Sequence, residues 1–154
     1  MKDNYLEHTR NEIITTETKV LVREYKNNLD KLTKNYNIGK ELAEAGKHYG
    51  EGTVKKYASI LTKEFGKGYK AAELRKMRAF YVLIQKCGAL RRTLSWNHYL
   101  KLLPLNEINE LNYYINITIR DNLSYWNLSL RIKSDEYHRL PIETRDKLET
   151  NKKK

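Results

Sequence analysis

The sequence predicts an all-α protein: a compact multi-helix domain that contains a helix-turn-helix and begins with a long helix. Two prolines and seven glycines in 154 residues leave few points at which a helix must end. Apolar residues recur every three or four positions, which is the period of a helix, and no segment alternates as a strand does. We therefore expect one helical domain over residues 1–140 and a polar, basic tail over residues 141–154.

The long first helix is predicted from an apolar stripe with a charged opposite face. Its members are Ile13, Ile14, Leu21, Val22, Tyr25, Leu29, Leu32 and Tyr36. The pattern continues through "NIGKELAEAGKHYG", in which Gly39 is a candidate kink and Gly46 and Gly50 are candidate stops.

Two further helices flank the glycine pair in "LTKEFGKGYKAAELRKMRAFY". The second helix is expected over residues 53–65 and the third over residues 70–86, with a tight turn at Gly66 and Gly68. Together they form the predicted helix-turn-helix of residues 53–86. We expect the apolar arc of the third helix to pack against Leu61, Phe65 and the helix that contains Trp96. That arc consists of Leu74, Met77, Phe80, Tyr81 and Ile84.

Polar residues predict where the remaining helices begin. Ser95 is a candidate N-cap for a short helix that ends before Pro104. Asn106 is a candidate N-cap for a helix of residues 107–120, and Ser124 for one that ends near residue 132. The apolar residues of the 107–120 helix are Ile108, Leu111, Ile115 and Ile119.

The positive charge is concentrated in one part of the chain. The protein carries a net charge of +11. From Lys63 to Arg92 there are nine basic and two acidic residues, a net charge of +7. Such a concentration favours a polyanionic partner, most simply nucleic acid. The alternatives are a solvated basic surface with no partner, or attraction to an acidic protein or an anionic membrane.

The third helix has an outward face suited to a DNA groove. Arg75 lies opposite the apolar arc, Lys76 and Arg78 lie on its flanks, and Ala71, Ala72 and Ala79 share the outward side. Small residues let a helix approach DNA closely, and long donors reach bases or phosphates. We expect Lys70, Arg75, Lys76 and Arg78 to face DNA and Lys63, Lys67, Arg91 and Arg92 to bind phosphates. The alternative, of equal weight on the pattern alone, is that Ala, Arg and Lys are good helix formers on a wet face.

An ordered series of motifs resembles the N-terminal domain of the YhcG family, over about residues 10–140. In order, the matching motifs are Tyr49-Gly50, Glu64-Phe65-Gly66-Lys67-Gly68, Leu74, Met77-Arg78, Phe80-Tyr81, Ser95-Trp96 and His98-Tyr99. The segments "YNIGKEL", with Asn37 in place of the family's Trp, "LSYWNLSLRI" and "YHRL" are also similar. The resemblance implies a helical domain, regarded as a helix-turn-helix DNA binder, that precedes a PD-(D/E)XK nuclease domain.

Four further positions depart from the family pattern. Lys70 stands where the family has Ser, and Glu73 where it has Asn, at the start of the third helix. A carboxylate there suits the helix dipole but repels phosphate. Leu123 and Trp126 replace the family's Trp and Arg. These changes affect base contacts from the start of the third helix more than the fold.

We expect no enzymatic activity, no cofactor and no metal. A PD-(D/E)XK nuclease holds its metal with carboxylates on strands, and that half of the family protein is missing from the sequence. The letters E-x-K occur at Glu17–Lys19 and Glu24–Lys26, but on the predicted first helix. The four histidines are scattered, and His98 is interpreted as a packing residue of a capped helix.

The expected location is cytoplasmic, with no membrane association. No apolar stretch has the length of a signal peptide or a membrane span. The single cysteine, Cys87, fits a reducing compartment.

The leading functional prediction is a domain that binds double-stranded DNA and targets a nuclease. The alternative is a protein–protein module that dimerises, or docks a nuclease domain or subunit, through the long first helix and the tyrosines. RNA binding is a third possibility, because basic surfaces with tyrosines stack on unpaired bases.

Overall fold

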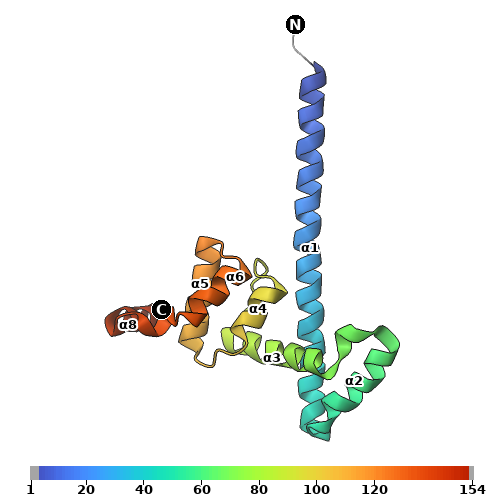
Figure 1. Ribbon diagram of the computed structural model, residues 1–154, viewed down its shortest axis with the longest axis vertical. Helices are drawn as coiled ribbons and strands as arrows, with labels where there is room; N and C mark the ends of the chain where they lie inside the picture. Colours follow the sequence, from blue (N-terminus) through green and yellow to red (C-terminus); the bar gives the residue numbers. More distant parts are fainter. Residues whose placement is uncertain (1–3, 153–154) are drawn as a thin grey trace.

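The computed structural model describes residues 4–152, and every regular element in that range is a helix. Figure 1 shows α1 as a long rod, with the other helices gathered around and beside its C-terminal half. An all-α fold with a long N-terminal helix is thus confirmed. The elements are α1 (Asn4–Tyr49), α2 (Gly52–Phe65), the 3-10 helix η1 (Lys67–Tyr69), α3 (Ala71–Cys87), α4 (Trp96–Leu102), α5 (Ile108–Asp121), α6 (Tyr125–Lys133), α7 (Glu136–Arg139) and α8 (Ile142–Lys152).

The first helix is continuous through Gly39, so the kink expected there is wrong. A Cβ atom at Gly39 would overlap the carbonyl of Met77 in α3. Gly39 is therefore a contact point, at which the absence of a side chain lets the two helix backbones meet. α1 ends at Tyr49, and Gly50 follows with a φ of 85°. Its N–H donates to the Gly46 carbonyl at 2.9 Å, so Gly50 is the stop, and the other candidate, Gly46, lies within the helix.

The core is built around α3. Leu74, Met77 and Phe80 are buried as predicted, and the Phe80 ring meets Trp96 and Tyr99 edge-on, with centroids 5.1 and 4.8 Å apart. Tyr81 is only half-buried. The burial predicted for Phe65 is wrong, because its side chain is 66% exposed. Phe65 is the last residue of α2, and its ring contacts Tyr69 of η1 instead of α3.

Two of the three predicted N-caps are confirmed. The Ser95 side chain accepts from the His98 N–H at 3.2 Å, and the Ser124 side chain accepts from the Asn127 N–H at 3.1 Å. The third is wrong, because α5 begins at Ile108 with Glu107 as its N-cap. Ile108 and Ile119 of the predicted stripe remain exposed, because they lie at the edge of the buried arc of α5. The buried apolar residues of this helix are Leu111, Tyr114, Ile115 and Ile117.

Most of the N-terminal half of α1 lies outside this core. The predicted stripe of the first helix is buried only from its later members onward, at Leu32 and, in part, at Leu29 and Tyr36. Its earlier members Ile13, Ile14, Leu21, Val22 and Tyr25 are all exposed. Amphipathicity therefore extends further along α1 than the core does.

The expected tail over residues 141–154 contains a helix, α8, up to Lys152. Among the helices of residues 4–152, none combines the length and the apolar character that crossing a membrane requires.

Candidate nucleic-acid interface

The connection between α2 and α3 is longer than the tight turn that the sequence predicted. Gly66 ends α2 with a φ of 99°, and its N–H donates to the Thr62 carbonyl at 2.9 Å. The chain then forms η1 before Lys70 becomes the N-cap of α3 in an extended conformation. The Lys70 side chain makes no capping hydrogen bond. An ammonium group has no acceptor with which to cap N–H groups. Lys67 and Lys70 are both exposed.

The outward face of α3 is a narrow stripe of mixed character. Arg75 is exposed as predicted, between the small residues Ala72 and Ala79. Ala71, predicted to join them, is half-buried. The stripe also contains Val82 and Lys86, which the candidate set did not include. Their spacing from Arg75, seven and eleven residues, places all three on one line of the helix and could have identified them.

The flanking basic residues of α3 are less available than Arg75. The Lys76 ammonium lies 3.1 Å from the Glu73 carboxylate one turn earlier. Arg78 is half-buried and lines a hollow of about 310 Å³ beside the C-terminal end of α1. Arg75 is therefore more accessible than Lys76 and Arg78.

Arg91 and Arg92 lie beyond the opposite end of α3, on a loop that hydrogen bonds from Asn28 and Tyr99 hold in place. The Asn28 amide of α1 donates to the carbonyls of Arg92 and Leu94 at 3.1 and 3.0 Å. The Tyr99 hydroxyl accepts from the Arg91 N–H at 2.7 Å and donates to the Arg91 carbonyl at 3.1 Å. Burial raises the Tyr99 pKa to about 12, so this hydroxyl remains a donor at neutral pH.

Six of the eight predicted contact residues form two exposed groups, whereas Lys76 is paired and Arg78 is half-buried. Lys63, Lys67, Lys70 and Arg75 surround the start of α3, where Lys63 is also exposed in the last turn of α2. Arg91 and Arg92 are exposed after its end. A helix of 17 residues spans about 25 Å, so the two groups cannot contact the same phosphates.

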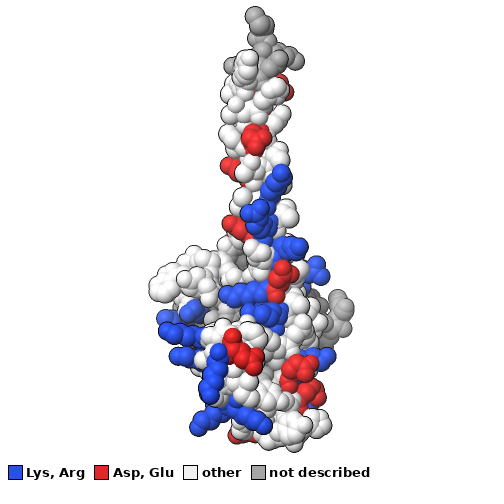
Figure 2. All heavy atoms as spheres, turned by 90° about the vertical axis from the view of Figure 1, so that its right-hand side faces the viewer, with Lys and Arg blue, Asp and Glu red and all other residues white. Residues whose placement is uncertain are grey.

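Most of this basic charge has no acidic partner. Of the nine basic side chains from Lys63 to Arg92, all within the described range, only Lys76 forms a salt bridge. In contrast, Arg131 in α6 is paired with Asp121 and Glu136. Figure 2, seen from the side of α2, shows blue side chains gathered over the lower body and the middle of α1. Acidic side chains therefore neutralise little of the positive charge between Lys63 and Arg92 in the folded protein.

A second polar cluster, at the junction of α5 and α7, was not predicted. Atoms of Glu107, Glu110 and His138 that could hold a metal ion lie within 4.8 Å of one another. The His138 Nδ1 atom lies 2.7 Å from an Asp135 oxygen, and this hydrogen bond raises the His138 pKa. Burial raises the pKa of Glu110. The signal in the sequence was two pairs spaced three apart, Glu107/Glu110 and Asp135/His138, which only the fold brings together.

A protonated His138 supplies a positive charge to this cluster without any ion.

His98, in contrast, is a structural residue, as predicted. Its Nε2 atom lies 2.7 Å from the Leu123 carbonyl, which can only accept, so Nε2 carries the proton. Its Nδ1 atom then accepts from the Ser95 N–H at 3.1 Å and completes the N-terminal cap of α4.

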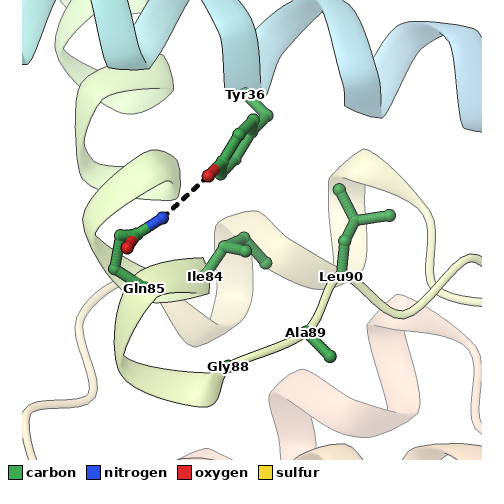
Figure 3. A pocket seen from close by; sticks show the side chains of 6 residues that line it. All are labelled: Tyr36, Ile84, Gln85, Gly88, Ala89 and Leu90. Atoms are coloured by element: carbon green, nitrogen blue, oxygen red, sulfur yellow. Dashed lines mark hydrogen bonds between the residues drawn. The ribbon is translucent and has the colours of Figure 1, made fainter.

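The hollow at the C-terminal end of α3 shows no catalytic arrangement. It has a volume of about 290 Å³, and its six lining residues include no charged side chain (Figure 3). Its two polar members are bonded to each other, because the Gln85 amide donates to the Tyr36 hydroxyl at 2.7 Å (Figure 3). The E-x-K letters at Glu17–Lys19 and Glu24–Lys26 lie on α1, exposed to solvent.

Comparison with known proteins identifies the family. A family model described as the DUF1016 N-terminal domain matches residues 6–139, most of the chain. No curated protein matches the chain, and no solved structure does. The matched region begins near the start of α1 and ends with α7, so it includes α2 to α7 and leaves out α8. The chain therefore belongs to the DUF1016 N-terminal domain family, which is the N-terminal domain of the YhcG family that its motifs resemble.

Proposed function

We propose that this protein is a non-catalytic domain that binds double-stranded DNA through α3 and the basic residues at its two ends. The supporting observation is the unneutralised charge: eight of nine basic side chains between Lys63 and Arg92 have no salt bridge. Exposed ammonium and guanidinium groups at this density attract phosphates, and their binding releases counterions. In a YhcG-like system the domain would deliver a nuclease to DNA in the cytoplasm.

In this proposal the α2–η1–α3 unit contacts the DNA, and α3 is the helix that contacts the bases. Arg75 stands between two alanines on the exposed stripe of α3, so a groove wall can approach the helix backbone there. Lys63, Lys67 and Lys70 surround the start of the same helix, where its N-terminal dipole also attracts phosphate. We assign base contact to Arg75 and phosphate contact to the lysines.

Binding measured at two salt concentrations tests this assignment. Duplex DNA, single-stranded DNA and RNA should be compared by fluorescence anisotropy with the full chain. We expect Lys67→Ala and Arg91→Ala to weaken binding to all duplexes alike and to reduce the slope of log K against log salt by about 0.9 each. Arg75→Ala should instead reduce the preference for the best duplex by about 1–3 kcal/mol.

The matched control is Arg120→Ala. Arg120 is exposed like Arg75 but lies at the end of α5, paired with Asp121 at 2.9 Å, so its loss should leave DNA binding unchanged. Glu73→Ala should tighten non-specific binding, because it removes a negative charge and also frees Lys76. If a folded Arg75→Ala/Arg78→Ala double variant keeps both affinity and preference, α3 is a packing element. Tighter binding to RNA than to duplex would favour the RNA alternative.

The absence of nuclease activity is a separate part of the proposal. We expect purified protein with Mg²⁺ or Mn²⁺ to leave plasmid DNA intact, because the E-x-K letters lie on one helix with no carboxylate cluster around them. The one group of potential metal ligands in the described residues is Glu107, Glu110 and His138. Cleavage that survives purification and is lost in Glu110→Gln would overturn the non-catalytic assignment.

A further inference from the structure

The N-terminal half of α1 carries large apolar side chains that remain in water. Ile13, Ile14, Val20, Leu21 and Tyr25 are each between 44 and 66% exposed. At 100° per residue, these five fall within one arc of about 140° around the helix. Leu32 and Leu42, which are buried against the rest of the protein, lie on the same arc further along α1. The side of α1 that forms the core in its C-terminal half is therefore apolar but uncovered in its N-terminal half.

A helix of this kind gains little stability by itself. Residues 5–27 make about six turns, and helices in proteins are held mainly by packing of an apolar face. The uncovered arc is thus a surface that a partner would stabilise. Its charges indicate which partner fits.

The segment is electrically neutral in a strongly basic protein. Residues 5–27 contain four acidic and four basic residues, whereas the whole chain carries +11. The acidic excess lies first: residues 5–17 net −2 and residues 18–27 net +2. Two copies of this segment can meet without net repulsion. They attract each other only when they run in opposite directions, so that each −2 portion faces a +2 portion.

Four charged residues of this segment lie on the arc; Glu7 is at its edge and faces the uncharged Asn27 in the register proposed below, and the other three define that register. Arg10, Glu17 and Glu24 lie among the apolar positions, seven residues apart. In a parallel pair each would face its own copy, and all three contacts would be between like charges. In an antiparallel pair centred on residue 17, Arg10 faces Glu24 of the second copy. The same register stacks Ile13 and Ile14 on Leu21 and Val20, and it leaves the two Glu17 residues as the only like-charge contact.

We propose that two copies of this chain pair in antiparallel orientation through residues 5–27 of α1, with Arg10 of each copy facing Glu24 of the other. The pairing buries the arc that the rest of the chain leaves uncovered. It does not depend on whether α3 binds DNA, so the two proposals can fail separately.

The mass of the full chain in solution tests the pairing. Light scattering at about 100 µM, well above the micromolar Kd of a modest specific complex, should give twice the mass of one chain. Leu21→Lys places a charge in the arc and should give a monomer with unchanged circular dichroism. Val22→Lys is the matched control, because Val22 is equally exposed, at 61%, but about 100° away from Leu21 around the helix. A monomeric wild-type chain, or equal disruption by both substitutions, would overturn the proposal.

Charge exchange tests the orientation. Arg10→Glu and Glu24→Arg should each weaken the dimer about tenfold, because each converts two attractive contacts per dimer into repulsive ones. The double variant Arg10→Glu/Glu24→Arg should restore wild-type affinity. In a parallel dimer the double variant would gain nothing over either single one, and that result would reject the antiparallel register. Glu17→Gln should tighten the dimer, and a weaker Glu17→Gln dimer would place the centre elsewhere.

Discussion

The two halves of α1 have the same apolar pattern and different surroundings. In the C-terminal half, Leu32 and Leu42 are 0 and 2% exposed, and Gly39 touches the backbone of α3. In the N-terminal half, Ile14 and Leu21 continue the same stripe at 62 and 66% exposure. Figure 1 shows why: α3 and α4 lie beside the lower part of α1, and nothing lies beside its upper part.

The difference shows that having an apolar face and having that face buried are separate properties of a helix. An apolar stripe indicates that a helix can be covered on one side. Whether it is covered depends on where the following helices turn back, which the stripe does not encode. In this protein the change falls near Asn28, whose amide binds the loop between α3 and α4.

The largest contrast is expected from leucines of the two halves. Leu32→Ala should lower the free energy of unfolding by about 2–5 kcal/mol, because it leaves a cavity in the core. Leu21→Ala, at a protein concentration where the chain is monomeric, should change it by less than about 0.5 kcal/mol. Urea unfolding followed by circular dichroism measures both. Similar losses for the two variants would mean that the N-terminal half of α1 folds back on the body.

Two glycines of α1 should respond to alanine with opposite signs. Gly39→Ala should destabilise the protein by about 1–3 kcal/mol, because its methyl group would force α1 and α3 apart. Gly46→Ala meets no atom within 4 Å and should stabilise the helix, by up to about 1 kcal/mol. Thermal melting of both variants is the measurement. A stabilised Gly39→Ala protein would show that the two helices do not meet there.

Adjacent asparagines mark the boundary between the halves. Asn28→Ala removes two hydrogen bonds to the loop carbonyls of Arg92 and Leu94, and should cost about 1–3 kcal/mol. Asn27→Ala alters an exposed residue and should cost much less. Asn28→Ala should also weaken DNA binding if Arg91 and Arg92 need this loop to be fixed. Equal stability of the two variants would place the boundary at another residue.

The smallest effect concerns pH, and it should arise in the C-terminal helices instead of α1. The raised His138 pKa means that its protonated form is favoured by folding. The contribution is complete below the unfolded pKa near 6.5 and is lost as pH rises through the folded value. We therefore expect the melting temperature to fall slightly as pH rises above about 6.5. This fall should be absent in His138→Gln. His8→Gln, on the exposed half of α1, should retain it.

Local features were predictable from the sequence to the extent that neighbouring residues determine them. Ser95 and Ser124 cap their helices because each cap is a contact within one turn. The burial of Leu74, Met77 and Phe80 followed from their common arc. Errors arose where the helical period alone does not show which residues a neighbouring helix covers. Phe65 is the last residue of α2, and Ile108 and Ile119 lie at the edge of the buried arc of α5.

The candidate site was partly predictable for the same reason. Exposure of Arg75 and its position between alanines could be computed from helix geometry. The half-burial of Arg78 and the salt bridge of Lys76 required the neighbours of each side chain. The Glu107, Glu110 and His138 cluster joins positions about 30 residues apart in the sequence, so neither of the two local pairs indicates by itself that they meet.

The sequence by itself determined the helical class, the concentration of charge between Lys63 and Arg92 and the family, because these depend on composition, period and ordered motifs. Only the tertiary structure decided which part of each amphipathic surface is covered. That outcome depends on long-range contacts such as Gly39 against Met77 and Asn28 against the loop after α3, whose geometry is set by the path of the whole chain. The same amphipathic helix α1 therefore forms core over one half and presents an apolar surface over the other.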